Sequence, residues 1–165
     1  MPILAGQLLT ASALNALTGV TGRQPSDTAP VVSSTVLVNT AIALALDANS
    51  VYGVHGVIIY DTSSTADYRW SISLPAGATV IHSDWGSISS GAAVDSPIGH
   101  SAYTALTGLI NGGVGIGTLM TMRYIGTITT AGTAGTATWQ HAQGTSTAVN
   151  TVTKAGSWLT AVKLA

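Results

Sequence analysis

Charged side chains are scarce in this chain of 165 residues. Asp, Lys and Arg together make up 7% of the sequence, and Glu does not occur. An ordinary soluble domain carries about 25% charged residues. Because surface charge keeps a free subunit soluble and separate from its copies, so neutral a chain indicates that much of its surface is covered, by other copies or by a larger assembly.

Cysteine is also absent, which excludes disulfides and thiolate metal sites. The formal net charge of −1 provides no field that would steer nucleic acid or an acidic lipid surface toward the chain. The basic residues are scattered along the sequence, and no apolar stretch approaches the roughly 20 residues that span a bilayer. We therefore expect neither a nucleic-acid partner nor a membrane.

Motifs for catalysis are missing as well. Ser89-Ser90-Gly91 falls in a predicted loop with no helix after it, unlike a nucleophile elbow. The glycines of residues 111–117 lie between predicted strands and have no Walker lysine, so they do not form a phosphate cradle. Every acidic residue is Asp, and most fall in predicted turns, which does not suit a glycosidase pair. We expect no catalytic residue, no cofactor and no enzymatic activity.

Two pairs of side chains resemble metal ligands. His82 and Asp84 fall on the same side of a predicted strand, but spacing identifies no third ligand, and zinc needs three or four. Asp61 and Asp67 bracket a predicted hairpin loop, where a carboxylate either binds calcium weakly or, more commonly, caps the turn. We therefore predict no metal site, turn caps at Asp61 and Asp67, and histidines at the surface or at an interface.

The sequence predicts one short helix, from Gln7 to Leu17. Thr10 suits the N-cap, Gly19 suits the position after the last turn, and Leu14 and Leu17 share a face. Two turns of helix are not stable alone in water. The helix therefore packs either on its own domain or, as an anchoring arm, on a neighbouring subunit. The arm's anchoring residues would be Leu4, Leu8, Leu9, Leu14 and Leu17.

Residues 19–30 contain two glycines and two prolines without hydrophobic periodicity, which predicts an irregular linker. We place the boundary there, with an arm and linker over 1–29 and a folded domain over 30–165. From residue 30 onward, alternating and β-branched segments separated by glycine-rich turns predict an all-β sandwich or jelly roll. The predicted strands are 31–38, 41–46, 51–60, 68–74, 79–85, 103–110, 118–129, 136–143, 148–153 and 158–164.

Tryptophan supplies much of the volume of the predicted core, since the chain has no Phe. Each such ring buries roughly 150–250 Å². Core packing is the expected role of Trp70, Trp85, Trp139 and Trp158, with a trimer interface as the alternative for one or two of them. Threonines on the outer faces of strands would keep those faces wet without charge.

Several segments carry a resemblance to a known group. They are AGQLLTASALNAL (5–17), LALDANSVY (44–52), IIYD (58–61), TADYR (65–69), LPAGAT (74–79), ATWQHAQ (137–143) and VTKAGSWL (152–159). The first is similar to the start of many minor tail and head-decoration proteins of tailed bacteriophages, especially those of actinobacteria, and the others resemble a recurring virion β-domain. The resemblance implies a jelly roll like that of the tumour-necrosis-factor and C1q group, which usually forms trimers, and it transfers no catalytic residue.

We therefore expect a jelly-roll β-sandwich with a short N-terminal helical arm. Its function would be that of a trimeric decoration, or cement, protein, assembled in the host cytoplasm and bound on the outer capsid surface. The arm's leucines would anchor the trimer to the major capsid protein. The alternative is a minor tail or fibre protein that binds a host-surface glycan or receptor through Trp85, Asp95 and Tyr103. A bound metal would instead indicate a small enzyme.

Overall fold

The computed structural model describes residues 19–86, 98–99, 104, 106 and 109–165. The helix expected over 7–17 and the leucines of the arm lie outside these residues. In the described part of the chain, all regular secondary structure is β-strand. No helix long and apolar enough to cross a membrane occurs there. The strands are β1 (Val20–Arg23), β2 (Val38–Leu46), β3 (Val51–Asp61), β4 (Tyr68–Ser73), β5 (Thr79–Gly86), β6 (Ile98–Gly99), β7 (Leu109–Asn111), β8 (Met120–Thr129), β9 (Gly135–Gln143), β10 (Val152–Thr153) and β11 (Trp158–Lys163).

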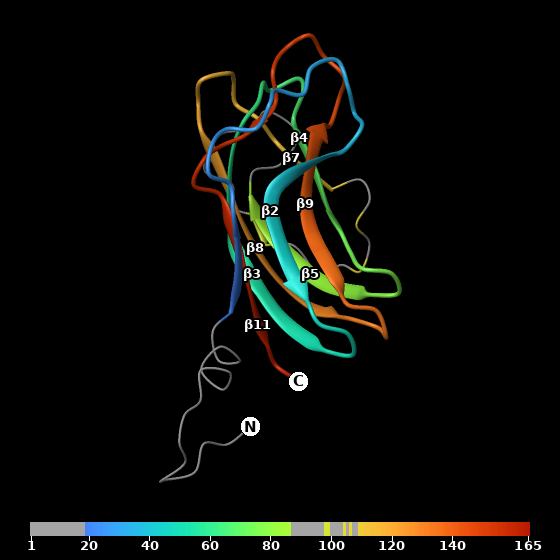
Figure 1. The fold of residues 1–165 in the computed structure, drawn as a ribbon. Helices are drawn as coiled ribbons and strands as arrows, with labels where there is room; N and C mark the ends of the chain where they lie inside the picture. The colour runs from blue at the N-terminus through green and yellow to red at the C-terminus, as the bar shows by residue number, and fades with distance from the viewer. Residues whose placement is uncertain (1–18, 87–97, 100–103, 105, 107–108) are drawn as a thin grey trace.

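The strands form two antiparallel sheets that pack face to face (Figure 1). The larger sheet has the order β1-β11-β3-β8-β5-β6, and β10 also pairs with β3. The smaller sheet has the order β2-β9-β4-β7. The described part of the chain is therefore an all-β sandwich, which confirms the class predicted from the alternating pattern.

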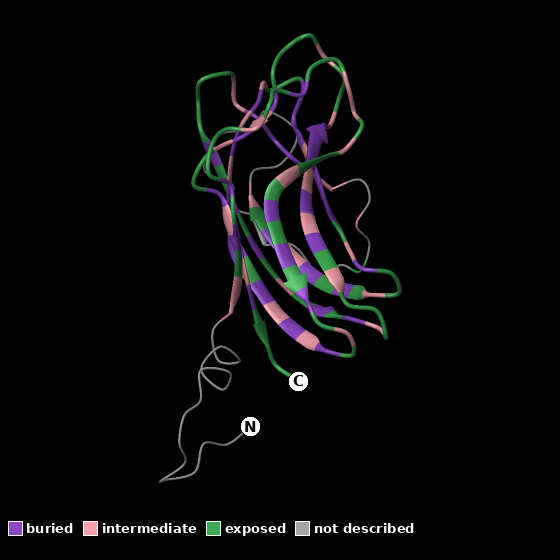
Figure 2. Cartoon of the chain, in the orientation of Figure 1, coloured by how far each residue is buried: buried purple, intermediate pink, exposed green. Residues whose placement is uncertain are grey.

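Alternation along each strand places the core between the two sheets (Figure 2). In β2, Ile42, Leu44 and Leu46 are buried, and the alanines between them are exposed. Because successive side chains of a strand point to opposite faces, this pattern turns one face of β2 toward the larger sheet. The longest pairing joins β3 to β8, from Val51 opposite Thr129 to Tyr60 opposite Met120.

Aromatic side chains from both sheets meet at the centre of the core. The rings of Trp70 on β4 and Trp139 on β9 stack with their centroids 4.6 Å apart. Tyr124 on β8 meets them edge-on at 5.8 and 5.7 Å respectively. The core role predicted for Trp70 and Trp139 is therefore confirmed.

The linker predicted for residues 19–30 contains a strand instead. Residues 20–23 form β1, which pairs with β11, and the buried Gln24 donates its backbone N–H to the carbonyl of Ser157 (2.8 Å). Four residues are too few to show periodicity. Gly22 is a close-packing position, because a Cβ there would lie 2.6 Å from the backbone of Ala43. The linker prediction is wrong for this segment, whereas the division of the chain near residue 30 stays a prediction.

The strand predicted over residues 31–38 is also largely irregular. Val31 makes one isolated bridge with Thr151, and Ser33 has a positive φ of 50°, which interrupts an extended path. Val36 is 70% exposed. The β-branched composition of this segment suggested a strand, but most of it has no neighbouring strand with which to pair. Of the strand predicted over 103–110, residues 109 and 110 belong to β7, and most of the others lie outside the described residues.

Candidate functional site

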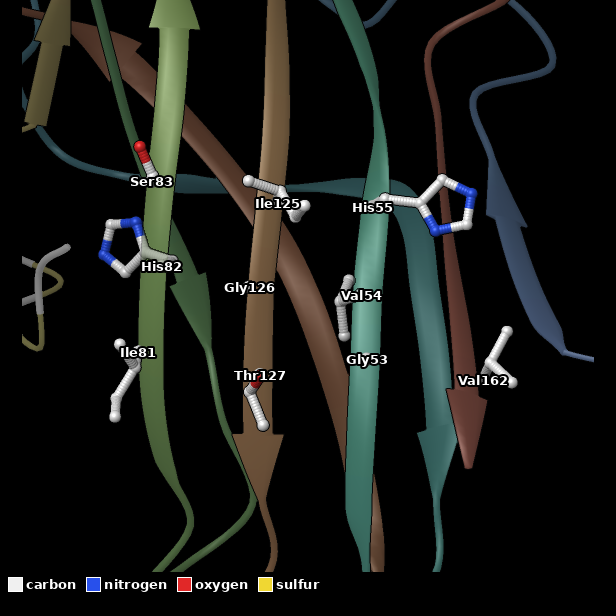
Figure 3. Close-up of a pocket in the computed structure, with 10 residues that line it drawn as sticks. All are labelled: Gly53, Val54, His55, Ile81, His82, Ser83, Ile125, Gly126, Thr127 and Val162. Carbon is white, nitrogen blue, oxygen red and sulfur yellow. The ribbon is translucent and has the colours of Figure 1, made fainter. Parts of the chain in front are cut away.

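The outer face of the larger sheet carries an unusual set of side chains across β11, β3, β8 and β5. The strand pairings align these side chains in three rows that run across the sheet. The rows are Trp158-Val57-Arg123-Trp85, Thr160-His55-Ile125-Ser83 and Val162-Gly53-Thr127-Ile81. We call these positions the outer face. Figure 3 shows the four strands side by side and labels His55, Ile125 and Ser83 of the second row and all four residues of the third row.

Large apolar side chains on this face are open to solvent. Ile125 is 61% exposed, Ile81 57%, Trp85 55% and Val162 38%, while Trp158 is half-buried. Single exposed apolar residues are normal on any protein. A contiguous group on one sheet face is different, because such patches mark interaction surfaces.

Strand β5 departs from the usual distribution of polar and apolar residues at four positions, although Val80 faces the core and Ser83 points outward in the usual way. Its polar His82 and Asp84 point into the core, whereas Ile81 and Trp85 point out toward solvent. In a sheet with one face in water, the apolar set faces inward. The reversal indicates that the outer side of β5 is suited to burial as well.

Two adjoining hollows shape the outer face. A groove of about 530 Å³ lies over Gly53, which has no side chain, with Val162 on one side and Ile81 on the other (Figure 3). A second hollow of about 370 Å³ lies between Trp158 and Trp85. Both are lined by His55 and Ile125, so they lie side by side, and we call them together the depression.

Aromatic contacts fix part of this depression. The ring of His55 extends toward β11 (Figure 3) and meets Trp158 edge-on, with the centroids 5.7 Å apart and the planes at 89°. This contact holds both rings over the boundary between β3 and β11. The wall of the depression is therefore built by packing within the sheet.

The charge on the outer face is of one sign. Arg123 is its permanently charged residue, and Arg23 lies at the edge, opposite Trp158 in the β1–β11 pairing. No position of the outer face is acidic. Its chemistry is thus apolar and aromatic with a cationic end.

Several acidic side chains of the described residues are bound elsewhere in the subunit. Asp27 accepts a hydrogen bond from Lys154, and Asp47 accepts one from Lys163 at 3.0 Å. Each of these bonds holds the pKa of its carboxyl below the usual range. These exposed pairs add little to stability.

The outer face of the smaller sheet has different chemistry. The outward positions of β2 include Ala41, Ala43 and Ala45, and those of β9 include Thr136 and Gln140. All are small or uncharged polar residues, as expected of a face that stays in water. This face therefore provides control positions for experiments on the larger sheet.

His82 and Asp84 lie on one side of their strand, as the sequence predicted, but that side faces the core. The His82 ring stacks on Tyr124 at 5.5 Å, and the Asn111 side-chain amide donates to Asp84 (3.1 Å). The Trp70 indole N–H donates to the Asn111 carbonyl at 2.6 Å. The expectation of a surface or interface histidine is wrong for His82. No group of three His or Asp side chains suited to a metal occurs among the described residues.

Asp61 and Asp67 do not cap the turn between them as predicted. Gly117 N–H donates to Asp61 (3.0 Å), and Gly113 N–H donates to Asp67 (3.1 Å). Burial raises the pKa of Asp67, against the opposing effect of its bond with Gly113. The Asp67 N–H donates to the carbonyl of Ser63 (3.1 Å), which closes the turn. The two carboxylates therefore attach the glycine-rich segment to the sandwich.

His141 is fully buried, so the surface expectation is wrong for it too. Neither ring nitrogen has a hydrogen-bond partner within the part of the chain that the structure describes. Its ring stacks on Tyr68 at 6.0 Å, and burial lowers its pKa to about 4. Among the described histidines, His55 is the exposed one, as predicted.

The structure separates the residues that the sequence singled out. Trp70 and Trp139 are in the core, whereas Trp85 and Trp158 lie on the outer face. Sequence reasoning missed Ile81, Ile125 and Val162 as surface residues. The available signal was the presence of apolar side chains at both odd and even positions of the same strands. The arm's leucines, Asp95, Tyr103 and His100 lie outside the described residues.

No family model matches the chain, and no curated protein matches it significantly. A structure of the infectious bursal disease virus Gt strain is similar at a TM-score of 0.26 and 12% identity, over 89% of this chain and 38% of that one. The infectious bursal disease virus VP2 subviral particle is similar at a TM-score of 0.22 and 13% identity, over 88% of this chain and 40% of that one. The chain thus spans about two fifths of these weak viral neighbours. Similarity at such TM-scores does not establish a shared fold or role.

Proposed function

We propose that this chain is a non-enzymatic structural protein of a phage virion, most specifically a trimeric decoration protein. It would bind the major capsid protein on the outer surface of the head and stabilise the shell, after assembly in the host cytoplasm. The observation that carries this proposal is the contiguous, acid-free apolar outer face on a chain with 7% charged residues. The proposal involves no catalytic residue, cofactor, nucleic acid or membrane.

The strand order supports the jelly-roll form of the sandwich. Along the chain, β1, β3, β8 and β11 of the larger sheet alternate with β2, β4, β7 and β9 of the smaller one. Most connections therefore pass from one sheet to the other. Connections of this kind wind eight strands into the two Greek keys of a jelly roll, and β5 and β6 extend the edge of the larger sheet.

The start of the described chain supports the idea of an arm. Gly19, the first described residue, lies against Thr160 and Val162 of β11, at the edge of the outer face. In the proposed trimer, three such arms would belong to one rigid body. Joining several modest contacts in this way raises overall binding by about 10²–10⁴-fold over a single contact.

Deletion of residues 1–18 tests the anchoring role. The truncated protein should still fold and form trimers, because β1 begins after the deletion, but its binding to capsids should fall at least about 100-fold. The measurement is co-sedimentation with heads that lack the protein. A full-length variant with Leu14→Ser and Leu17→Ser tests the leucines themselves. Stoichiometric decoration by the truncated protein would show that the arm is not the anchor.

A tail or fibre protein that binds a host-surface glycan is the second candidate. Trp85 and Trp158 border the smaller hollow, with Arg123 between them. Exposed indole rings with a nearby hydrogen-bond donor suit an amphipathic ligand. Labelling the protein on intact particles separates the two candidates, because a decoration protein lies on the head and a fibre protein on the tail. Adsorption of the purified protein to host cells would favour the fibre.

A further inference from the structure

We infer that the outer face of the larger sheet is the surface through which each copy packs against another copy of this chain. The inference deepens the proposed function and rests on it for the trimeric state. It identifies which of the two sheet faces is turned toward the neighbouring copies. The smaller sheet then faces solvent or the shell.

The first argument is the reversed pattern of β5. Ile81 and Trp85 point outward while His82 and Asp84 are buried, although a strand at a solvent face would place these side chains the other way round. The buried polar side chains are accommodated, since Asn111 donates to Asp84. Both sides of β5 therefore match a protein environment, as in a strand that lies between a core and an interface.

The second argument is the contrast in composition between the two outer faces. The interior of a homomeric interface is more apolar than ordinary surface and is enriched in Trp and Arg. The outer face of the larger sheet has Trp85, Trp158 and Arg123 around Ile125, whereas the smaller sheet presents Ala, Thr and Gln. The smaller sheet also has Arg69 and the exposed Ile110 at its β4–β7 edge, but it has no outward Trp. The larger sheet therefore has the more interface-like outer face.

The third argument is size. Strands lie about 4.8 Å apart and rise about 3.3 Å per residue. The three rows, together with β1 and a fourth row that starts at the exposed Leu164 beside Val51, therefore cover about 600 Å². A face that packs only against the same face of another copy gives a dimer, so in a trimer each copy divides this face between its two neighbours. Three footprints then bury about 1,800 Å² in the whole trimer. The face is large enough to hold copies together.

The stage at which the outer face becomes exposed indicates which partner binds it. An open patch of this kind leads to association as soon as the chain folds, before any shell is present. At that stage, another copy of the chain is the partner that is present at the same concentration as the chain itself. Arg123 lies in the outermost of the three rows and is exposed, so its guanidinium can stay hydrated at the rim.

A matched pair of charge substitutions tests this inference on the full chain. Ile125→Asp places a carboxylate at the centre of the outer face, and Thr136→Asp places the same charge on the smaller sheet. The mass of each purified protein is measured by light scattering over a dilution series, with circular dichroism as the check on folding. We expect Thr136→Asp to remain trimeric like the wild type, and Ile125→Asp to raise the dissociation constant at least about 100-fold.

Trp85→Ala serves as a second variant, so that misfolding of Ile125→Asp does not leave the inference untested. It removes an exposed ring without touching the core and should raise the dissociation constant about tenfold. Trimers unaffected by both folded variants would overturn the inference but leave the proposed function standing. If both variants dissociate as expected but the wild-type trimer does not bind capsids, the inference is supported and the proposed capsid function is wrong. Unchanged mass with lost adsorption to host cells would assign the face to a host ligand and overturn the inference.

Discussion

Replacement of Trp139 by alanine is expected to lower the free energy of unfolding by about 4 kcal/mol. The Trp139 side chain is fully buried, stacks on Trp70 at 4.6 Å and donates its indole N–H to the Tyr68 hydroxyl at 3.1 Å. Its removal leaves a large cavity and an unfilled position between the sheets. Guanidinium denaturation followed by circular dichroism gives the change in unfolding free energy.

Trp85→Ala is the matched control, because it removes the same side chain from a position that is 55% exposed. Its effect should be less than half as large. It should also depend on protein concentration, since the variant acts through association rather than through the core. Equal, concentration-independent losses for Trp85→Ala and Trp139→Ala would contradict the assignment of one ring to the core and the other to the outer face.

Acidification from pH 6.5 to pH 4 is expected to destabilise the fold by about 3 kcal/mol through His141 alone. Burial lowers the pKa of this imidazole from 6.5 to about 4. Between these values the unfolded chain binds a proton that the folded chain does not, so stability falls as the pH is lowered through this range. Below pH 4 both states are protonated and the contribution of His141 levels off.

His141→Leu tests this pH dependence with a side chain of similar size that does not titrate. The variant should show a much smaller loss of stability than the wild type between pH 6.5 and pH 4, measured by denaturation at a series of pH values. Comparing the two proteins at each pH removes the contribution of Asp67, whose raised pKa acts in the opposite direction. An unchanged slope in His141→Leu would contradict the burial of a neutral imidazole.

Much of the sandwich could be predicted because its long strands alternate. Ile42, Leu44 and Leu46 are apolar at every second position and lie in the core as expected. The strands β3, β8 and β9 lie close to their predicted ranges for the same reason. Local pattern is sufficient where one face of a strand is in water and the other is buried.

The rest depends on partners that are distant in the sequence. On β5, the burial of His82 and Asp84 relies on Trp70 and Asn111 from two other strands, which no local pattern reveals. The outward position of Trp85 follows from the same arrangement. β1 became a strand because β11 provides its edge. The outer face could not be predicted, because it exists only when four strands lie in register.

The most direct test of the account is the mass of the purified, full-length protein in solution. The central claim is that the uncharged apolar surface is covered by sibling copies. Light scattering should therefore give three times the mass of one chain, down to concentrations well below one micromolar. A stable, soluble single chain at all concentrations would contradict the claim, because the outer face would then be open to water without any partner.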